Sequence, residues 1–241
     1  MTSAVPEGSQ SRGVLSLEVR WILPGRLDTA VAAWFGTSVF QMESREDAYL
    51  LSPDLGGLSV KVRGGRALEV KAFLGSPAVL DLPGRACGRM QYWQKWSFPL
   101  HSFSRGSREP DGWRRVRKQR RTIRFAVNGE RIRPVAEYVG DLADEARCAV
   151  ELTELRTQHR DWWSLGFEAT GPAALLRTGL ETTAALLFSR ALQEGAELRM
   201  ADAMSYAEWL RSRPGTERHA SALFGQDAAA DHGAAAGSAP G

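Results

Sequence analysis

The chain of 241 residues contains only two cysteines and four histidines. Cys87 and Cys148 cannot form the several bridges of a disulfide framework, and the sequence has no CxxC pair that would provide zinc ligands. The histidines, which have no companions at metal-ligand spacing, are His101, His159, His219 and His232. These absences argue against a disulfide scaffold and a zinc site, and we expect a reducing, cytoplasmic location.

Long apolar runs are absent as well. No stretch of about 18 apolar residues occurs, so the sequence predicts no transmembrane helix. Residues 1–13, MTSAVPEGSQSRG, have no hydrophobic signal-peptide core and are expected to form a disordered lead-in. The Ala/Gly-rich residues 214–241 are expected to form a disordered tail. Without a GxxxxGK[ST] or G-x-S-x-G motif, the P-loop and serine hydrolase classes have no support.

Strand patterns dominate the part of the chain between residues 14 and 169. Gly-, Pro- and Asp-rich turn sequences separate several of these segments, and Asn128-Gly129 is a favoured tight turn. The expected strands lie near 14–23, 47–51, 57–64, 67–74, 91–98, 115–125, 147–155 and 162–169. Few helical patterns interrupt them, so antiparallel pairing is favoured, and eight strands suffice to close a small barrel.

Helical patterns come after the strands. Residues 172–194 place apolar side chains at three- and four-residue spacing, and 205–212 predicts a second short helix. A further short helix is expected within 25–36. We therefore predict one α+β domain over 14–213: an antiparallel, closed or nearly closed β-barrel of about eight strands, with a charged interior and C-terminal helices packed outside.

The strands alternate apolar and charged residues. In 15–21, Ser16, Glu18 and Arg20 share one face, and apolar side chains form the other. One interpretation is an ordinary sheet whose charged face meets water. The other turns the charged face inward to line a barrel. The excess of Lys and Arg over neutral polar residues, with acids on only a few strands, is typical of a pocket for a phosphate-rich anion and a divalent metal.

The strand sequences resemble the triphosphate tunnel metalloenzymes, or CYTH-like domains, over roughly residues 14–170. SLEVRW (16–21) resembles the opening Glu-x-Glu-x-Lys strand of that family, and REDAYLLSPDL (45–55) resembles the segment that leads into its first hairpin. LSVKVRGGRALEVK (58–71) and VRKQRR (116–121) resemble its basic strands, and AVELTEL (149–155) its acidic strand. Ser16 and Thr153 stand where the family has acids.

The resemblance implies roles for ten residues. Glu18 would be a catalytic residue and metal ligand, Arg20 a catalytic residue that contacts phosphate, and Glu151 and Glu168 further metal ligands. The residues that would bind the triphosphate are Lys61, Arg63, Lys71, Lys95, Lys118 and Arg120. The implied cofactor is Mg²⁺ or Mn²⁺.

The sequence is compatible with three functions. The first is metal-dependent hydrolysis of a linear triphosphate, with inorganic triphosphate, thiamine triphosphate and nucleotides as the alternatives. The second is a non-catalytic module that binds polyphosphate or a nucleotide on the same scaffold, because Ser16 removes a carboxylate. The third is an RNA-interacting protein that acts through its basic outer surface, although we expect only weak nonspecific contact with nucleic acid from Arg115, Arg117 and Arg121. No membrane partner is expected, and the sequence does not predict the oligomeric state.

Overall fold

The structure is a computed structural model that describes residues 13–36, 41–100, 111–129, 131–138, 145–190 and 197–212. Its strands are β1 (Val14–Pro24), β2 (Gln41–Leu50), β3 (Leu58–Arg63), β4 (Ala67–Leu82), β5 (Ala86–Pro99), β6 (Trp113–Asn128), β7 (Arg131–Val135), β8 (Ala146–Thr157) and β9 (Arg160–Thr170). Its helices are α1 (Thr29–Phe35), α2 (Leu176–Phe188) and α3 (Tyr206–Arg211), with 3₁₀ turns η1 (Ala173–Leu175) and η2 (Met200–Asp202).

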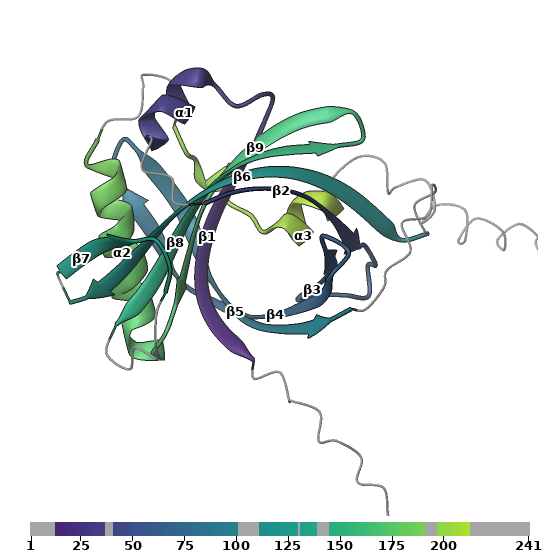
Figure 1. Cartoon of the computed structure of the whole chain (residues 1–241), viewed down its shortest axis with the longest axis horizontal. Helices are drawn as coiled ribbons and strands as arrows, with labels where there is room; N and C mark the ends of the chain where they lie inside the picture. Colours follow the sequence, from purple (N-terminus) through teal and green to yellow (C-terminus); the bar gives the residue numbers. More distant parts are fainter. Residues whose placement is uncertain are drawn as a thin grey trace, which may run out of the picture.

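Eight of these strands close into an antiparallel barrel (Figure 1). The strand order is β2-β3-β4-β5-β1-β9-β8-β6, and β2 also pairs with β6, which completes the ring. β7 adds a short hairpin to the far part of β6. The predicted fold class is therefore confirmed, and every predicted strand is present. The interpretation as a sheet with its charged face in water is wrong, because closure turns that face inward.

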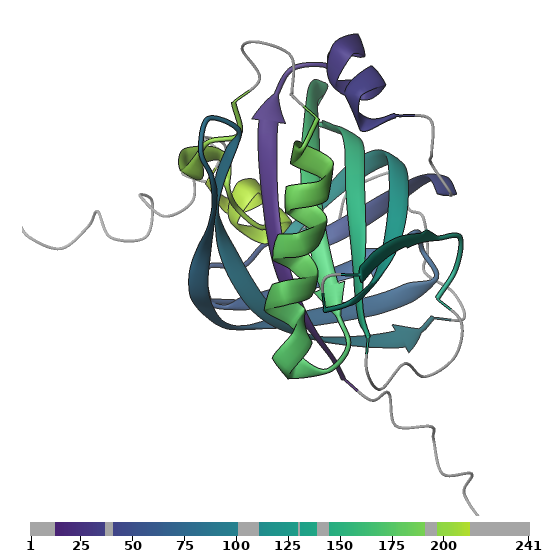
Figure 2. The same ribbon diagram turned by 90° about the vertical axis from the view of Figure 1, so that its left-hand side faces the viewer.

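The alternation in the sequence explains which face points where. In β1, Leu17, Val19 and Trp21 are buried in the main apolar core on the outside of the barrel. Helix α2 covers this core and packs on β8, β9, β6 and β1 (Figure 2). Gly179 allows the approach of α2, since a Cβ there would lie 2.6 Å from the Cβ of Ala146. This packing confirms a C-terminal helix outside the barrel.

The prediction that the C-terminal helices pack outside is wrong for helix α3, because its apolar side chains pack against inward-facing residues of the barrel. Helix α3 lies within the ring of strands in Figure 1. Its Trp209 and Leu210 are buried with inward-facing side chains at one end of the barrel, and these partners are Ile22, Tyr49, Val116 and Leu155. Ser205 and Glu208 form a capping box that starts the helix. α3 therefore fills one end of the barrel with apolar side chains.

Other side chains of β9 and of the turn before it lie away from the charged interior of the barrel. His159 lies in the β8–β9 turn, where it and Gln158 both have positive φ, so it is an exposed turn residue. Trp163 belongs to the outer core, and Trp162 packs against Trp209 of α3. Apart from Gly13, the expected lead-in (1–13) and tail (214–241) lie outside the described residues. Within the described segments, each helix is too short or too polar to cross a membrane.

Candidate functional site: a basic cavity inside the barrel

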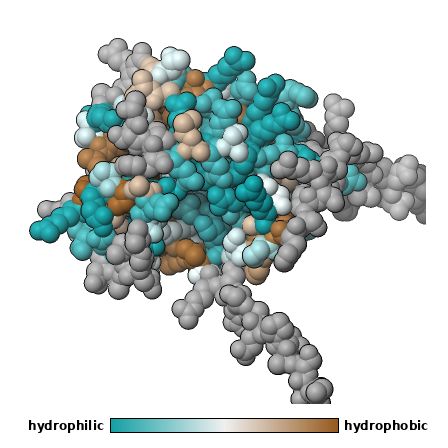
Figure 3. All heavy atoms as spheres, in the orientation of Figure 1, coloured by the Kyte–Doolittle hydropathy of each residue, from teal (hydrophilic) through white to brown (hydrophobic). Residues whose placement is uncertain are grey.

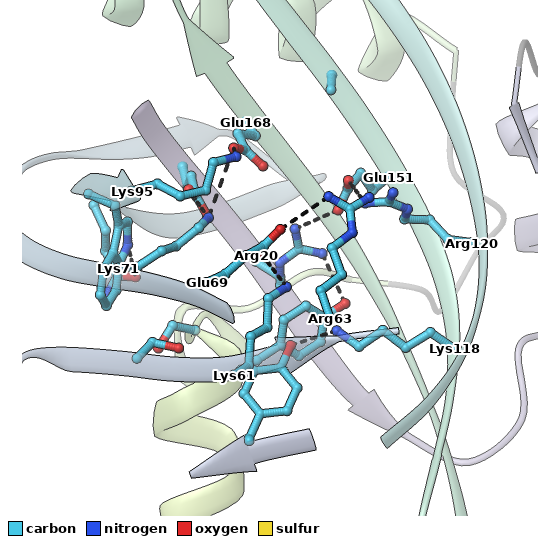
Figure 4. A pocket seen from close by; sticks show the side chains of 18 of the residues that line it. Arg20, Lys61, Arg63, Glu69, Lys71, Lys95, Lys118, Arg120, Glu151 and Glu168 are labelled. Atoms are coloured by element: carbon cyan, nitrogen blue, oxygen red, sulfur yellow. Dashed lines mark hydrogen bonds and ion pairs between the residues drawn. The ribbon is translucent and has the colours of Figure 1, made fainter. Parts of the chain in front are cut away.

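A cavity of about 290 Å³ occupies the barrel interior. Figure 3 shows hydrophilic residues gathered over the face of the barrel seen in Figure 1. All ten site residues predicted from the sequence line this one cavity: Glu18, Arg20, Lys61, Arg63, Lys71, Lys95, Lys118, Arg120, Glu151 and Glu168. These residues come from seven strands that the fold brings together. Figure 4 labels all of them except Glu18. Their chemical roles stay predictions.

A closed ring of alternating charges, which we call the inner ring, lies on β2, β3 and β4. Its members, each paired with the next, are Glu43, Arg45, Asp47, Lys61, Glu69 and Arg63. Asp47 is fully buried and contacts Arg45 at 2.9 Å and Lys61 at 3.5 Å. Lys61 lies 2.9 Å from Glu69. The carboxylates hold the cations of the inner ring side by side against their mutual repulsion.

Arg20 joins this network from the opposite wall. Its cross-strand neighbour on β9 is Gly166, which is also the neighbour of Glu151 on β8. Because Gly166 has no side chain, the guanidinium crosses it and contacts Glu151 at 2.9 Å. Arg120 contacts the other oxygen of Glu151 and lies 2.5 Å from Glu43 of the inner ring. One carboxylate therefore orients two guanidinium groups toward the cavity.

A second, smaller cluster is formed by β1, β4, β5 and β9. Glu18 and Glu168 are direct neighbours across β1 and β9. Lys71 contacts Glu18 at 2.5 Å and Glu168 at 3.9 Å, and Lys95 contacts Glu168 at 3.3 Å. Ser16 donates a 2.7 Å hydrogen bond to Glu18. This second cluster has two carboxylates and two ammonium groups, so it carries no net charge.

The end of the cavity next to α3 is aromatic and cationic. The ammonium of Lys118 lies 3.6 Å from the centre of the Tyr206 ring and 2.7 Å from the hydroxyl of Tyr49. Arg20 stacks on Tyr206 at 4.6 Å and bonds its hydroxyl at 3.2 Å. The Tyr206 hydroxyl also bonds Ser164 at 2.9 Å. We call Lys118, Tyr49, Tyr206 and Arg20 the floor of the cavity.

The cavity is positively charged overall. Eight of its lining residues are Lys or Arg, whereas four are Glu. Counting Glu43 and Asp47, which pair with the lining cations, leaves two positive charges in excess. The carboxylate that pairs with Lys118, Asp47, also contacts two other cations, Arg45 and Lys61. A polyanion would therefore be attracted into the cavity.

These contacts shift the pKa values of the buried groups. Burial favours the neutral form of Glu69, but Lys61, Arg63 and Lys95 together outweigh it and lower the carboxyl pKa to about 2. The pKa of Glu168 is likewise about 2, because Lys71 and Lys95 overcome the effect of burial. Lys118 goes the other way: burial lowers its ammonium pKa, Tyr49 and Asp47 only partly compensate, and Lys61 adds repulsion. The floor thus contains a cation that lacks full compensation.

The donor set bears on the expected metal. The described residues contain no group of three or more His, Cys, Asp or Glu side chains that could hold a metal by themselves. Glu18 and Glu168 are adjacent, however, and Mg²⁺ is commonly bound by one or two carboxylates together with phosphate oxygens. The second cluster therefore fits a divalent ion that arrives with a phosphate ligand. Without a phosphate ligand, the two carboxylates of the second cluster do not form a complete metal site.

Several cavity residues were not among those predicted. Arg45 and Tyr49 of β2, Glu69, and Tyr206 all line the cavity, and Asp47 supports it from behind. The alternation of charges on 41–49 was the available signal for β2. Nothing in the sequence indicates that Tyr206 lies inside a barrel, because its position depends on how the chain returns after α2.

The outer face of the basic strand β6 behaves as expected for solvated residues. Arg117 is mostly exposed and pairs with Glu46 at 3.3 Å. Arg115 contacts the same carboxylate at 3.0 Å, and Arg121 lies 3.4 Å from Glu154. Acidic neighbours therefore offset much of this positive charge, which weakens the case for a nucleic-acid surface on the outside of the barrel.

Comparisons with known proteins give matches only at the level of structure. No family model and no curated protein matches the sequence. One similar solved structure is the S. pombe RNA triphosphatase Pct1 in complex with the Spt5 CTD, with TM-score 0.37 and 11% identity over 74% of this chain and 83% of that one. Another is the capping enzyme triphosphatase of Mimivirus, with TM-score 0.35 and 10% identity over 72% of this chain and 89% of that one.

Proposed function

We propose that the cavity binds the triphosphate group of a linear triphosphate, whether inorganic triphosphate, thiamine triphosphate or a nucleotide. The observation that carries this proposal is the convergence of eight cationic side chains on one small cavity with excess positive charge. Arg binds phosphate oxygens through two parallel N–H groups, and Lys acts as a point charge. A compact anion with several charges is the ligand that such a cavity suits.

Binding would exchange ion pairs within the protein for ion pairs to phosphate. The carboxylates of the inner ring, together with Glu151, keep their cations in place beforehand, so little reorganisation is needed. Lys118 would gain most, since its charge is the least compensated of the floor. Arg20 and Arg120, already fixed by Glu151, would present guanidinium groups to the oxygens.

Metal-dependent hydrolysis of the triphosphate is the second candidate function. It is favoured by the adjacent carboxylates of Glu18 and Glu168, which would bind Mg²⁺ or Mn²⁺ together with phosphate oxygens. Such an ion, when bound, polarises the phosphoryl group and neutralises charge. The part of the protein would be to orient the phosphate chain and to stabilise the charge on its outer oxygens through Arg20, Lys118 and Arg120. Such an ion would have to replace Lys71 and Lys95 as the partners of these carboxylates. If this replacement does not occur, the barrel is a binding module.

Two measurements on the same protein separate these functions. Binding is measured by calorimetry with inorganic triphosphate, with and without Mg²⁺, and turnover by phosphate release from inorganic triphosphate, thiamine triphosphate and ATP. We expect binding by the wild type and its loss in a Lys61→Ala, Arg120→Ala double variant. An undetectable heat of binding in the wild type would overturn the proposal.

The variant Glu18→Ala tests the second candidate, and Glu181→Ala on the exposed face of α2 is its control. Hydrolysis at the second cluster predicts metal-dependent turnover that Glu18→Ala abolishes and Glu181→Ala leaves intact. Tight binding without turnover in the wild type would assign the protein to the binding modules.

A further inference from the structure

The rim of the barrel, at the end away from α3, carries charged and aromatic groups that the proposed triphosphate site does not use. Along β6, Val116 touches α3, Lys118 belongs to the floor, and Arg120 lies at mid-depth. Arg124 is the next charged residue on this inward face, six residues beyond Lys118. At about 3.3 Å per residue it lies about 20 Å along the strand from the floor.

Arg124 differs from the inner cations in its partners. Each cation of the inner ring and of the second cluster contacts at least one carboxylate. The guanidinium of Arg124 instead bonds two neutral oxygens, the carbonyl of Ala136 at 3.2 Å and the side-chain oxygen of Gln41. Within the described parts of the chain, its charge is held in place without a carboxylate partner.

Tyr138 lies beside Arg124 and is itself one of the residues that line the cavity. Its ring centre is 6.0 Å from the guanidinium carbon of Arg124 and 5.3 Å from that of Arg147. The Tyr138 hydroxyl is buried and has no hydrogen-bond partner among the described residues. A buried hydroxyl without a partner is costly, so it marks a place for a ligand oxygen or an ordered water.

We infer that Arg124, Tyr138 and Arg147 form a rim subsite for phosphate groups that continue beyond the triphosphate held in the cavity. This inference rests on the proposed function, and it makes the ligand longer than a triphosphate. Arg124 supplies a charge that no carboxylate of the described segments neutralises, and the Tyr138 hydroxyl supplies a neutral donor. The same chemistry recognises inorganic polyphosphate and the phosphate backbone of a 5′-triphosphorylated oligonucleotide.

The test compares the affinities of ligands that share a triphosphate and differ in the groups attached to it. Inorganic triphosphate, a longer linear polyphosphate and a 5′-triphosphorylated oligoribonucleotide are titrated at one ionic strength, because salt weakens the binding of each. We expect the polyphosphate or the oligonucleotide, or both, to bind the wild type about tenfold more tightly than triphosphate, as one added charged hydrogen bond implies. Whichever ligand shows the gain identifies the source of the phosphates.

Variants test whether the rim residues cause this gain in affinity. Arg124→Gln keeps a donor for the carbonyl of Ala136 and should remove most of the gain while leaving triphosphate affinity unchanged. Tyr138→Phe keeps the ring and should reduce the gain a few-fold. Arg160→Gln, which removes an exposed charge in the β8–β9 hairpin, is the matched control and should change nothing.

The outcomes are distinguishable. If both long ligands bind no more tightly than triphosphate, or if Arg124→Gln keeps the gain, the rim subsite is wrong and the triphosphate site stands. ATP is titrated in the same way. If ATP binds more tightly than triphosphate through Arg124 and polyphosphate does not, the rim binds an aromatic ring, and the inference is wrong. Failure of triphosphate itself to bind overturns the proposed function, whereas Arg124-dependent binding of polyphosphate alone would still support the rim subsite.

Discussion

The guanidinium of Arg20 occupies the space that a side chain at Gly166 would need. A Cβ on Gly166 would lie 2.6 Å from the Cζ atom of Arg20 and 2.7–2.8 Å from its two terminal nitrogens. Gly166 does not have a positive φ, so its role is to leave room and not to permit a special backbone conformation. The absence of a side chain on β9 thereby determines where a charge on β1 can lie.

Gly166→Ala should displace Arg20 from Glu151 and weaken triphosphate binding about tenfold or more. Overpacking of this kind commonly costs about 1–3 kcal/mol of unfolding free energy. Calorimetric affinity and the unfolding midpoint in urea check both effects. Gly56→Ala is the control, since nothing lies within 4 Å of a Cβ there. An unchanged affinity in Gly166→Ala would show that Arg20 does not contact the ligand.

Lys118→Met should separate binding from stability. Burial and the neighbouring Lys61 oppose the charge of Lys118. If Lys118 is removed, Asp47 still pairs with Arg45 and Lys61. We expect an unfolding free energy equal to or above that of the wild type, and triphosphate binding weakened more than tenfold. Arg117→Met, on the outer face of the same strand, should preserve binding. A strongly destabilised Lys118→Met protein would contradict this account of the floor.

Asp47→Asn, unlike Lys118→Met, should lower the unfolding free energy of the protein. The carboxylate is fully buried among Arg45, Lys61 and Lys118, so its loss leaves three cations in repulsion. We expect a loss of about 3–5 kcal/mol in unfolding free energy without ligand. A saturating polyanion should restore much of it, because ligands stabilise the state that they bind.

Thermal unfolding with and without inorganic triphosphate measures this rescue. The midpoint should rise by more for Asp47→Asn than for the wild type. Asp54→Asn, an exposed acid in the β2–β3 turn, should behave as the wild type does. A smaller rise in Asp47→Asn would mean that the inner ring does not face the ligand.

Stability should fall as the solution becomes acidic. Glu69 and Glu168 have pKa values of about 2 in the folded protein, against 4.5 for the ordinary group. Because the folded carboxyls resist protonation, their contribution is fully present above about pH 4.5 and is lost as the pH falls toward 2. At about 1.4 kcal/mol per pKa unit, each carboxyl contributes about 3 kcal/mol.

Urea unfolding between pH 2 and pH 7 checks this window. The unfolding free energy of the wild type should be nearly constant above about pH 4.5 and should fall steeply below it. Glu168→Gln should show a shallower loss, since one of the shifted carboxyls is gone. An equal slope in the variant would show that Lys71 and Lys95 do not stabilise the charged form of Glu168.

The barrel was predictable because alternation is a local property. Glu18 and Arg20 occur two residues apart, so any extended backbone places them on one face, and the apolar side chains between them occupy the other. Alternation alone does not predict that the charged face turns inward. That prediction also needed the excess of Lys and Arg over neutral polar residues on this face. Closure then brought all ten predicted residues to one cavity.

β2 shows where the sequence pattern was too weak. Its outer face carries Ser44, Glu46 and the exposed Met42, so no apolar stripe marks the strand, and only its last residues were predicted. The inward charges Glu43 and Arg45 were missed for this reason. Tyr206 was missed for another, since a six-residue helix carries no information about which opening it enters.

Because α3 packs into one end of the barrel, the described residues leave the opposite end as the entrance to the cavity. A chain-like ligand could enter only end-first and could not be threaded through to the other side. If the protein cleaves a ligand in the cavity, the fragment nearer the entrance must leave before the deeper phosphate can dissociate from Lys118 and Arg20. The departure of that innermost phosphate from a deep, positively charged position would then set the pace of successive turnovers.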